Sequence, residues 1–166
     1  LVDPGVDLSP RVRQITGLSP ADLEGAPSPA VAAAALARFA GDDPVVGHSV
    51  AHDLAFLARA GVRVGPRAYD TFELSTILVP EAPRYALNVL LDVLGIQAAD
   101  THRALADAHA HRALFTALLA RARRIDPTTL RAINRLSAGS TWALGDVFRL
   151  AAATPVALGV RPAAPA

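Results

Sequence analysis

Two short strand-like segments, each running directly into a helical pattern, constrain the fold of this chain more than any other feature. Residues 44–48 lie between turn signals and precede an apolar helical pattern that stops at Gly61. Residues 67–70 precede a second helical pattern over 72–78. Strands that alternate with helices are typical of α/β domains. Because the strand segments are few and short among many helices, we expect an α/β or α+β domain with most of its sheet missing.

Apolar residues at helical spacing predict the other elements. Ser49 is expected to cap the helix that ends before Gly61. Residues 1–27 are expected to form a connecting segment, in which Ser19 caps a short helix. Further helices are expected over 30–40, 86–94, 104–123 and 127–138, with a last amphipathic turn near 140–150. The Ala/Pro-rich tail, residues 151–166, is expected to be disordered.

Composition narrows the class of protein. The chain has 166 residues, of which 52% are hydrophobic and 19% charged, as in globular domains. Its net charge of +1 provides no strong field toward nucleic acid or acidic membranes. There is no cysteine, which excludes disulfides and thiolate metal sites. There is no methionine either, so we expect the chain to be a piece of a longer protein.

His102 and Asp107 form the first candidate site. Five residues apart, they cannot share one face of a continuous helix. They can meet if His102 lies in a loop that folds back over the first helical turn. A carboxylate with a neighbouring histidine suits a metal ligand plus a general base. The alternative is an exposed loop histidine and an acid that the helix dipole favours.

Asp53 forms the second candidate, because a strand followed by a helix places it in the first helical turns. Acids near the carboxyl ends of strands often line a crevice in α/β sheets. The alternative is again an acid that stabilises the helix N-terminus. His48 and His52, at i and i+4, suggest a metal pair less strongly than local hydrogen bonding.

Four segments taken in order resemble a known family. They are residues 3–27, residues 45–57 (VVGHSVAHDLAFL), residues 69–96 and residues 101–119 (THRALADAHAHRALFTALL). Together they resemble the DnaQ-like 3′–5′ exonucleases of the DEDDh class, over roughly residues 1–122. The second segment carries Asp53, and the fourth carries His102 and Asp107 in a His-x4-Asp spacing.

The resemblance implies a ribonuclease H-like exonuclease fold acting on the 3′ ends of DNA or RNA. In this family two divalent cations, Mg²⁺ or Mn²⁺, are held by four carboxylates, and two of these form an Asp-x-Glu pair on the first strand. The resemblance implies Asp53 and Asp107 as metal ligands and His102 as the base. His48 and Ser49 are the candidate substrate-binding residues. Two metals would clamp the attacking and leaving oxygens.

The sequence departs from the family in three places. The strand carrying Asp-x-Glu is missing, and Asp3 cannot replace it because it stands in a later turn. Ser49 stands where the family commonly has Asn, and His52 where it often has Phe. We therefore expect a fold without its first strands and a chain that is inactive alone.

Residues 130–150 resemble the segment that follows the exonuclease domain in bacterial proteins fused to a DinG-like helicase. We accordingly expect an exonuclease domain over 1–122, a helical extension over 123–150 and the tail. A basic stretch between the two parts either contacts phosphates or faces solvent. It consists of Arg121, Arg123, Arg124, Arg131 and Arg135.

The expected partners are a single-stranded DNA or RNA 3′ end and a polymerase subunit or fused helicase, with no membrane, in the bacterial cytoplasm. Two alternatives remain open. One is a non-catalytic interaction module of the same fold. The other is an HD-type metal phosphohydrolase, suggested by His52-Asp53, although that class is all-helical.

Overall fold

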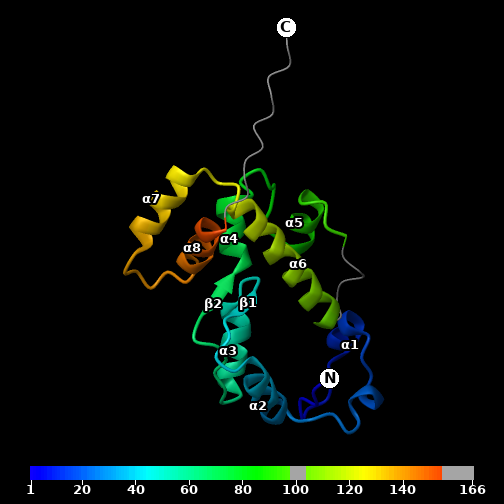
Figure 1. Cartoon of the computed structure of the whole chain (residues 1–166). Coiled ribbons are helices and arrows are strands. Elements are labelled where there is room, and N and C mark those ends of the chain that lie inside the picture. The colour runs from blue at the N-terminus through cyan, green and yellow to red at the C-terminus, as the bar shows by residue number, and fades with distance from the viewer. Residues whose placement is uncertain (98–103, 155–166) are drawn as a thin grey trace.

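The computed structural model describes residues 1–97 and 104–154 (Figure 1). Helices predominate around two short strands. In chain order the elements are α1 (Pro10–Thr16), the 3-10 helix η1 (Pro20–Leu23), α2 (Pro29–Ala40), β1 (Val45–Gly47), α3 (Ala51–Arg59), β2 (Ala68–Asp70), α4 (Thr71–Leu78), α5 (Leu87–Val93), α6 (Ala104–Ala122), α7 (Pro127–Ser137) and α8 (Gly145–Ala153).

The two strands are parallel, with Val45 opposite Ala68 and Gly47 opposite Asp70. Both lie where the sequence predicts them, and each leads into a helix, so the mixed α/β class is confirmed for the described residues. Because β1 and β2 run in the same direction, their carboxyl ends lie side by side. The turn before α3 therefore lies next to the start of α4.

Ser-Pro pairs start several of the helices. Ser28 accepts a hydrogen bond from the Val31 N–H (3.5 Å), and proline occupies the first position of α2. The same arrangement at Ser9 and Pro10 starts α1. The expectation that residues 1–27 contain only one short helix is therefore wrong at Pro10–Thr16, where the same cap signal was available.

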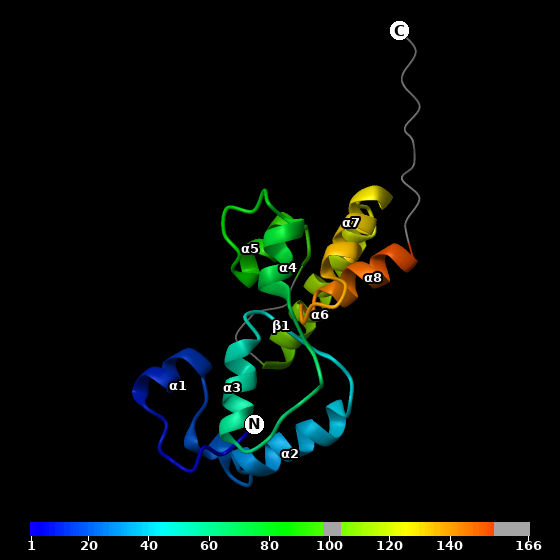
Figure 2. The same ribbon diagram turned by 90° about the vertical axis from the view of Figure 1, so that its left-hand side faces the viewer.

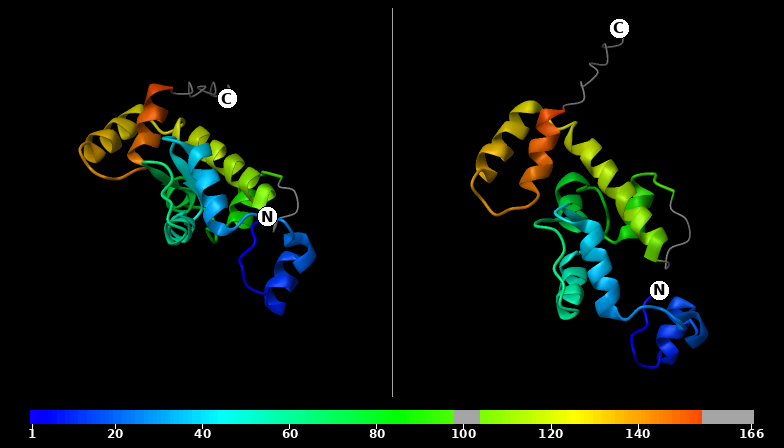
Figure 3. Two further views of the ribbon diagram at one scale, coloured as in Figure 1. Left: turned by 90° about the horizontal axis from the view of Figure 1, so that it is seen from below. Right: turned by 60° about the horizontal axis from the view of Figure 1, so that its bottom comes forward.

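The core lies among α4, α5, α6, α7 and α8, which gather at one end of the molecule (Figure 2). Its fully buried side chains include Leu74, Leu90, Leu114, Leu118 and Phe148. At the other end, α1, α2 and α3 stand apart from this core (Figure 3). No helix in the described part of the chain is long and apolar enough to cross a membrane.

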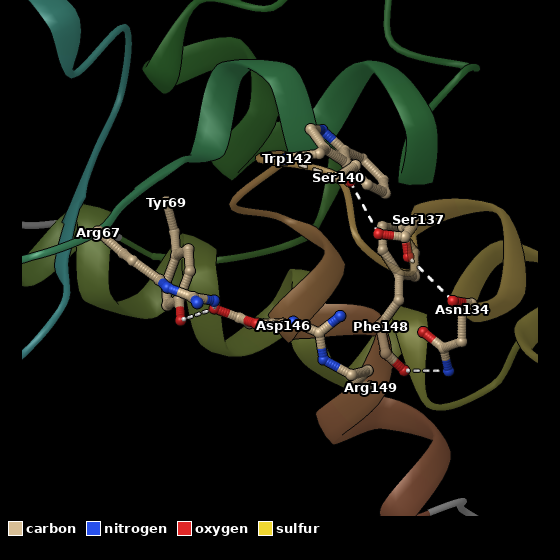
Figure 4. A network of polar contacts seen from close by, with 9 residues as sticks. All are labelled: Arg67, Tyr69, Asn134, Ser137, Ser140, Trp142, Asp146, Phe148 and Arg149. Carbon is tan, nitrogen blue, oxygen red and sulfur yellow. Dashed lines mark hydrogen bonds and ion pairs between the residues drawn. The ribbon is translucent and has the colours of Figure 1, made fainter.

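The α7–α8 pair is fastened to the rest of the fold by a polar network (Figure 4). Asp146 forms ion pairs with Arg67 and Arg149 and accepts a hydrogen bond from the Tyr69 hydroxyl (3.1 Å). Burial opposes the ionised form, but these three partners still hold the pKa of Asp146 below its usual range. Because Arg67 and Tyr69 belong to the β2 region, the network ties α8 to the sheet.

The helical extension shares the core of the preceding domain. Leu130, Leu144 and Phe148 lie in the same buried cluster as Leu114. The helix α8 continues through Ala153, beyond residue 150, where the extension is expected to end. Residues 155–166 of the expected tail lie outside the described residues.

Candidate active site

A cavity of about 780 Å³ lies beside β1. Most of its wall is apolar and comes from α2, β1, α3 and the residues around Val64. Its charged or titratable lining residues are Asp43, Asp53, Asp107 and His111. Two carboxylates that the sequence singles out, from segments far apart in the chain, thus line one cavity.

Asp53 lies in the first turn of α3 and is exposed. The helix that carries it has no buried residue, and Phe56 on the same helix is 66% exposed. Asp53 therefore stands on an element that packing alone holds weakly.

Asp107 lies in the first turn of α6 and is half-buried. In contrast to α3, this helix buries Ala110, Leu114, Leu118 and Ala122 in the core. Asp107 is thus presented to the cavity by a helix that is anchored in the core.

His111 lines the same cavity one helical turn beyond Asp107. Its ring stacks on that of His48, with the centroids 6.2 Å apart. Burial, followed by the nearby His48, lowers the pKa of His111, while Asp107 and Asp53 act in the opposite direction. Sequence reasoning missed this residue, although the i, i+4 spacing from Asp107 places both on one helix face.

The turn between β1 and α3 differs from the expectation. Ser49 does not cap the helix; it adopts a left-handed backbone with φ = 57°. The N-cap residue of α3 is Val50, which has no side-chain cap. The Ser49 and Val50 N–H groups instead donate to the carboxylate of Asp70, at 2.9 and 3.2 Å. A carboxylate from the neighbouring strand end thus replaces the predicted serine cap.

His48 uses both of its ring nitrogens inside the protein. Its Nε2 donates to the carbonyl oxygen of Tyr85 (2.7 Å), and its Nδ1 lies 3.0 Å from the Thr71 hydroxyl. His52 is exposed, with Nδ1 3.3 Å from the carbonyl oxygen of Ser49. Both histidines thus make the local hydrogen bonds that the sequence favours over a metal pair. The substrate-binding role expected of His48 stays a prediction.

Several predicted features lie elsewhere. His102, the predicted base, lies outside the described residues. An Asp-x-Glu spacing does occur at Asp22 and Glu24, but the structure places it around η1, where Asp22 accepts hydrogen bonds from Ser19. In the basic stretch, Arg121 donates to the Leu78 carbonyl oxygen and pairs with Glu81.

We tested whether the residues present fit a metal site. Carboxylate oxygens suit Mg²⁺, and Asp53 and Asp107 line one cavity. Within residues 1–97 and 104–154, however, no three His, Cys, Asp or Glu side chains lie close enough to hold a metal ion. The cavity therefore fits part of a metal site and does not complete one.

Parallel strands that lead into helices define an α/β domain, and acidic side chains line a cavity beside its sheet. The sequence model of the exonuclease family RNase T matches residues 1–115 of this chain. The chain therefore belongs to this exonuclease family, whose members generally use divalent metals. An all-helical HD-type phosphohydrolase is incompatible with this match and with the parallel strands.

Relatives with assigned names point the same way. The chain is 29% identical over 124 residues to the DNA polymerase III subunit epsilon of Aquifex aeolicus, covering 72% of this chain and 61% of that protein. It is 31% identical over 149 residues to the PolC-type DNA polymerase III of Lacticaseibacillus paracasei, covering 86% of this chain and 10% of that protein. It is also 30% identical over 128 residues to a putative bifunctional exonuclease/endonuclease protein of Mycobacterium tuberculosis, covering 73% of this chain and 20% of that protein. The match thus spans less than two thirds of each of these relatives.

Proposed function

We propose that this chain is the 3′–5′ exonuclease part of a protein that removes nucleotides from the 3′ ends of DNA or RNA. The observation that carries the proposal is the placement of Asp53 and Asp107 on one cavity. These residues come from α3 and α6, and the exonuclease family model spans both positions. The same cavity would accept the terminal nucleotide.

Asp53 and Asp107 would be ligands of Mg²⁺ or Mn²⁺ in a two-metal site, and His102 would be the general base. Bound divalent cations supply Lewis-acid stabilisation of the charge that develops on the phosphoryl oxygens. The apolar wall of the cavity would exclude water and strengthen electrostatic interactions there. Residues on α6 would hold Asp107 in place, because that helix is packed in the core.

We also propose that this chain by itself has no exonuclease activity. Two metals need more carboxylates than Asp53 and Asp107 provide. Asp43 also lines the cavity, yet no three suitable side chains in the described ranges come together. The Asp22-x-Glu24 pair serves η1 and does not line this cavity.

The proposed partners follow from the relatives. Two of them are named as components of DNA polymerase III. We accordingly propose a single-stranded DNA or RNA 3′ end as substrate and a polymerase subunit as partner, in the bacterial cytoplasm. A fused helicase after α8 remains the other arrangement that the sequence suggests.

The second candidate function is a non-catalytic interaction module of the same fold. It is favoured by the incomplete metal-ligand set in the described residues. It predicts binding to a partner without hydrolysis, whatever segment is added to the chain.

Degradation of an oligonucleotide separates these candidates. We would incubate a single-stranded 3′-labelled DNA or RNA with Mn²⁺ and either this chain or a form extended upstream by an Asp-x-Glu strand. Activity in the extended form alone, lost in Asp107→Ala, is the expected result. Activity of the unextended chain would contradict the two-metal argument. If neither form cleaves the oligonucleotide, the interaction module is favoured.

A further inference from the structure

Two neighbouring side chains, those of Asp70 and Thr71, form hydrogen bonds with the backbone of the turn that joins β1 to α3. We propose that Asp70 and Thr71 are positioning residues that hold this turn and thereby place Asp53 on the cavity. The inference rests on the proposed function only in the role it gives to Asp53. It concerns residues that touch neither metal nor nucleotide.

Asp70 contributes three hydrogen bonds from the end of β2. Its Oδ1 accepts from the N–H of Ser49 (2.9 Å) and from the N–H of Phe72 (2.8 Å). Its Oδ2 accepts from the N–H of Val50 (3.2 Å). The same carboxylate thus caps α4 and also accepts hydrogen bonds from the two N–H groups that precede α3. The N-cap residue of α3, Val50, provides no side-chain cap of its own.

Thr71 holds the other half of the turn. It is fully buried, and its hydroxyl donates to the Gly47 carbonyl oxygen (3.1 Å). Its Oγ1 also lies 3.0 Å from Nδ1 of His48. Gly47, Ser49 and Val50 are therefore each held by a hydrogen bond to the dipeptide at positions 70 and 71, and His48 lies against Thr71.

The turn needs such support because its backbone is strained and crowded. A left-handed conformation brings the Cβ atom of a residue other than glycine close to the following carbonyl oxygen, and Ser49 has φ = 57°. A Cβ atom at Gly47 would lie 2.8 Å from the Cγ2 of Val50, so the two residues pack closely. Without partners, a chain of this sequence would relax toward an ordinary right-handed turn.

The position of Asp53 depends on this turn more than on packing. Asp53 lies three residues beyond Val50, on a helix with no buried residue. Asp107 lies on α6, which is anchored by its own buried face. Loosening the turn is therefore expected to displace Asp53 and to leave Asp107 in place.

Two substitutions separate the contacts, and one serves as a matched control. Asp70→Ser keeps a hydroxyl that caps α4, but one oxygen cannot reach both Ser49 and Val50. Thr71→Val removes the hydroxyl at nearly constant size. The control is Asp126→Ser, which makes the same change at the N-cap of α7, where Asp126 accepts from Thr128 and Thr129.

The experiment measures amide hydrogen exchange and Mn²⁺-induced broadening of amide resonances in this chain. We expect faster exchange over residues 49–54 in Asp70→Ser and Thr71→Val. We also expect the Mn²⁺ concentration needed to broaden Asp53 to rise by roughly 10-fold to 100-fold, the usual range for residues that orient a metal ligand. Amide exchange around Asp107 should be unchanged in both variants, and Asp126→Ser should change neither the exchange rates nor the Mn²⁺ response. Ser49→Gly, which relieves the strained φ, should partly restore Asp53 in the Asp70→Ser background.

Unchanged amide exchange over residues 49–54 in both variants would overturn the proposal, as would an equal increase in exchange around Asp53 and around Asp107. If Asp70→Ser does not fold, Asp70→Asn supplies the test, since it keeps an acceptor for Ser49 and Phe72 and loses only the Val50 contact. The proposed function fails separately, if wild-type Asp53 does not respond to Mn²⁺ and the extended chain cleaves nothing. In that case the exchange rates over 49–54 still decide whether Asp70 and Thr71 hold the turn.

Discussion

Phe148 and Phe39 show how differently the two halves of the molecule are packed. Phe148 in α8 is fully buried, whereas Phe39 in α2 is 89% exposed. Residues 1–67 are all described, and their buried apolar side chains are those of Ala33, Val50 and Val64. The half from β2 to α8 buries a continuous cluster of leucines around Phe148. Asp107 therefore belongs to the well-packed half, and Asp53 to the weakly packed one.

The comparison teaches that the two candidate ligands are positioned by different means. Asp107 is placed by hydrophobic burial of the helix that carries it. Asp53 is placed by the β1–β2 pairing and by hydrogen bonds to one turn. Hydrogen bonds are directional and individually modest, so the Asp53 side should respond to single polar substitutions.

The largest expected effect comes from the core. Phe148→Ala should lower the free energy of unfolding by about 3–5 kcal/mol, because it removes a fully buried aromatic side chain. Urea unfolding followed by circular dichroism measures this loss. The control is Phe39→Ala, which should change stability by less than about 0.5 kcal/mol. Equal losses at both positions would remove the contrast between the halves.

A smaller effect is expected where α8 is tied to β2. Asp146→Asn should destabilise the chain by about 1–2 kcal/mol near neutral pH, because charge-assisted bonds to Arg67, Tyr69 and Arg149 are weakened. Chemical unfolding of both proteins measures the difference. Asp126→Asn, at an exposed helix cap, is the matched control.

The same residue predicts a pH dependence. The folded pKa of Asp146 lies below its unfolded value near 3.8, so its contribution to stability is complete above that value. The contribution is lost as the pH falls through the lower folded pKa. Thermal unfolding between neutral pH and pH 2 should therefore show a steeper acid loss in the wild type than in Asp146→Asn. Parallel curves for the two proteins would show that this carboxyl does not stabilise the folded chain.

A stabilising change is expected in the turn. Ser49→Gly should raise the free energy of unfolding by up to about 1 kcal/mol, because glycine adopts a positive φ without strain. Ser49→Ala keeps the strain and should be nearly neutral. Thermal unfolding of the three proteins checks the order, and a loss of stability in Ser49→Gly would mean that the turn is not strained.

The smallest effect on stability should come from the exposed apolar side chains. Phe39 and Phe56 are 89% and 66% exposed, beside Val31 at 58%. Large exposed apolar patches promote association. Phe39→Asp combined with Phe56→Asp should reduce self-association in sedimentation experiments while leaving the unfolding free energy nearly unchanged. A monomeric wild type at high concentration would contradict this expectation.

Local patterns predicted the elements well. Both strand segments and the helices from residue 30 onward follow from periodicity and from proline or glycine signals. The Ser-Pro signal also marks the start of α1. The expectation of a connecting segment is wrong there, because the rest of residues 1–27 has the composition of a linker. Ser49 was misassigned as a cap, since nothing local reveals that a carboxylate 21 residues away takes the backbone N–H groups.

The candidate site also has features that the local sequence predicts and features that depend on tertiary contacts. The residue types and order of Asp53 and Asp107 point to an exonuclease, and the spacing of Asp107 and His111 would have placed them on one helix face. The roles of Asp70 and Thr71 follow only from the parallel pairing that sets β2 beside β1. The sequence by itself determined the helices, the strands and the family, because these depend on neighbouring residues and ordered motifs. Only the tertiary structure decided that α7 and α8 complete the core and that the end of β2 holds the turn before Asp53, because those contacts join residues distant in the chain.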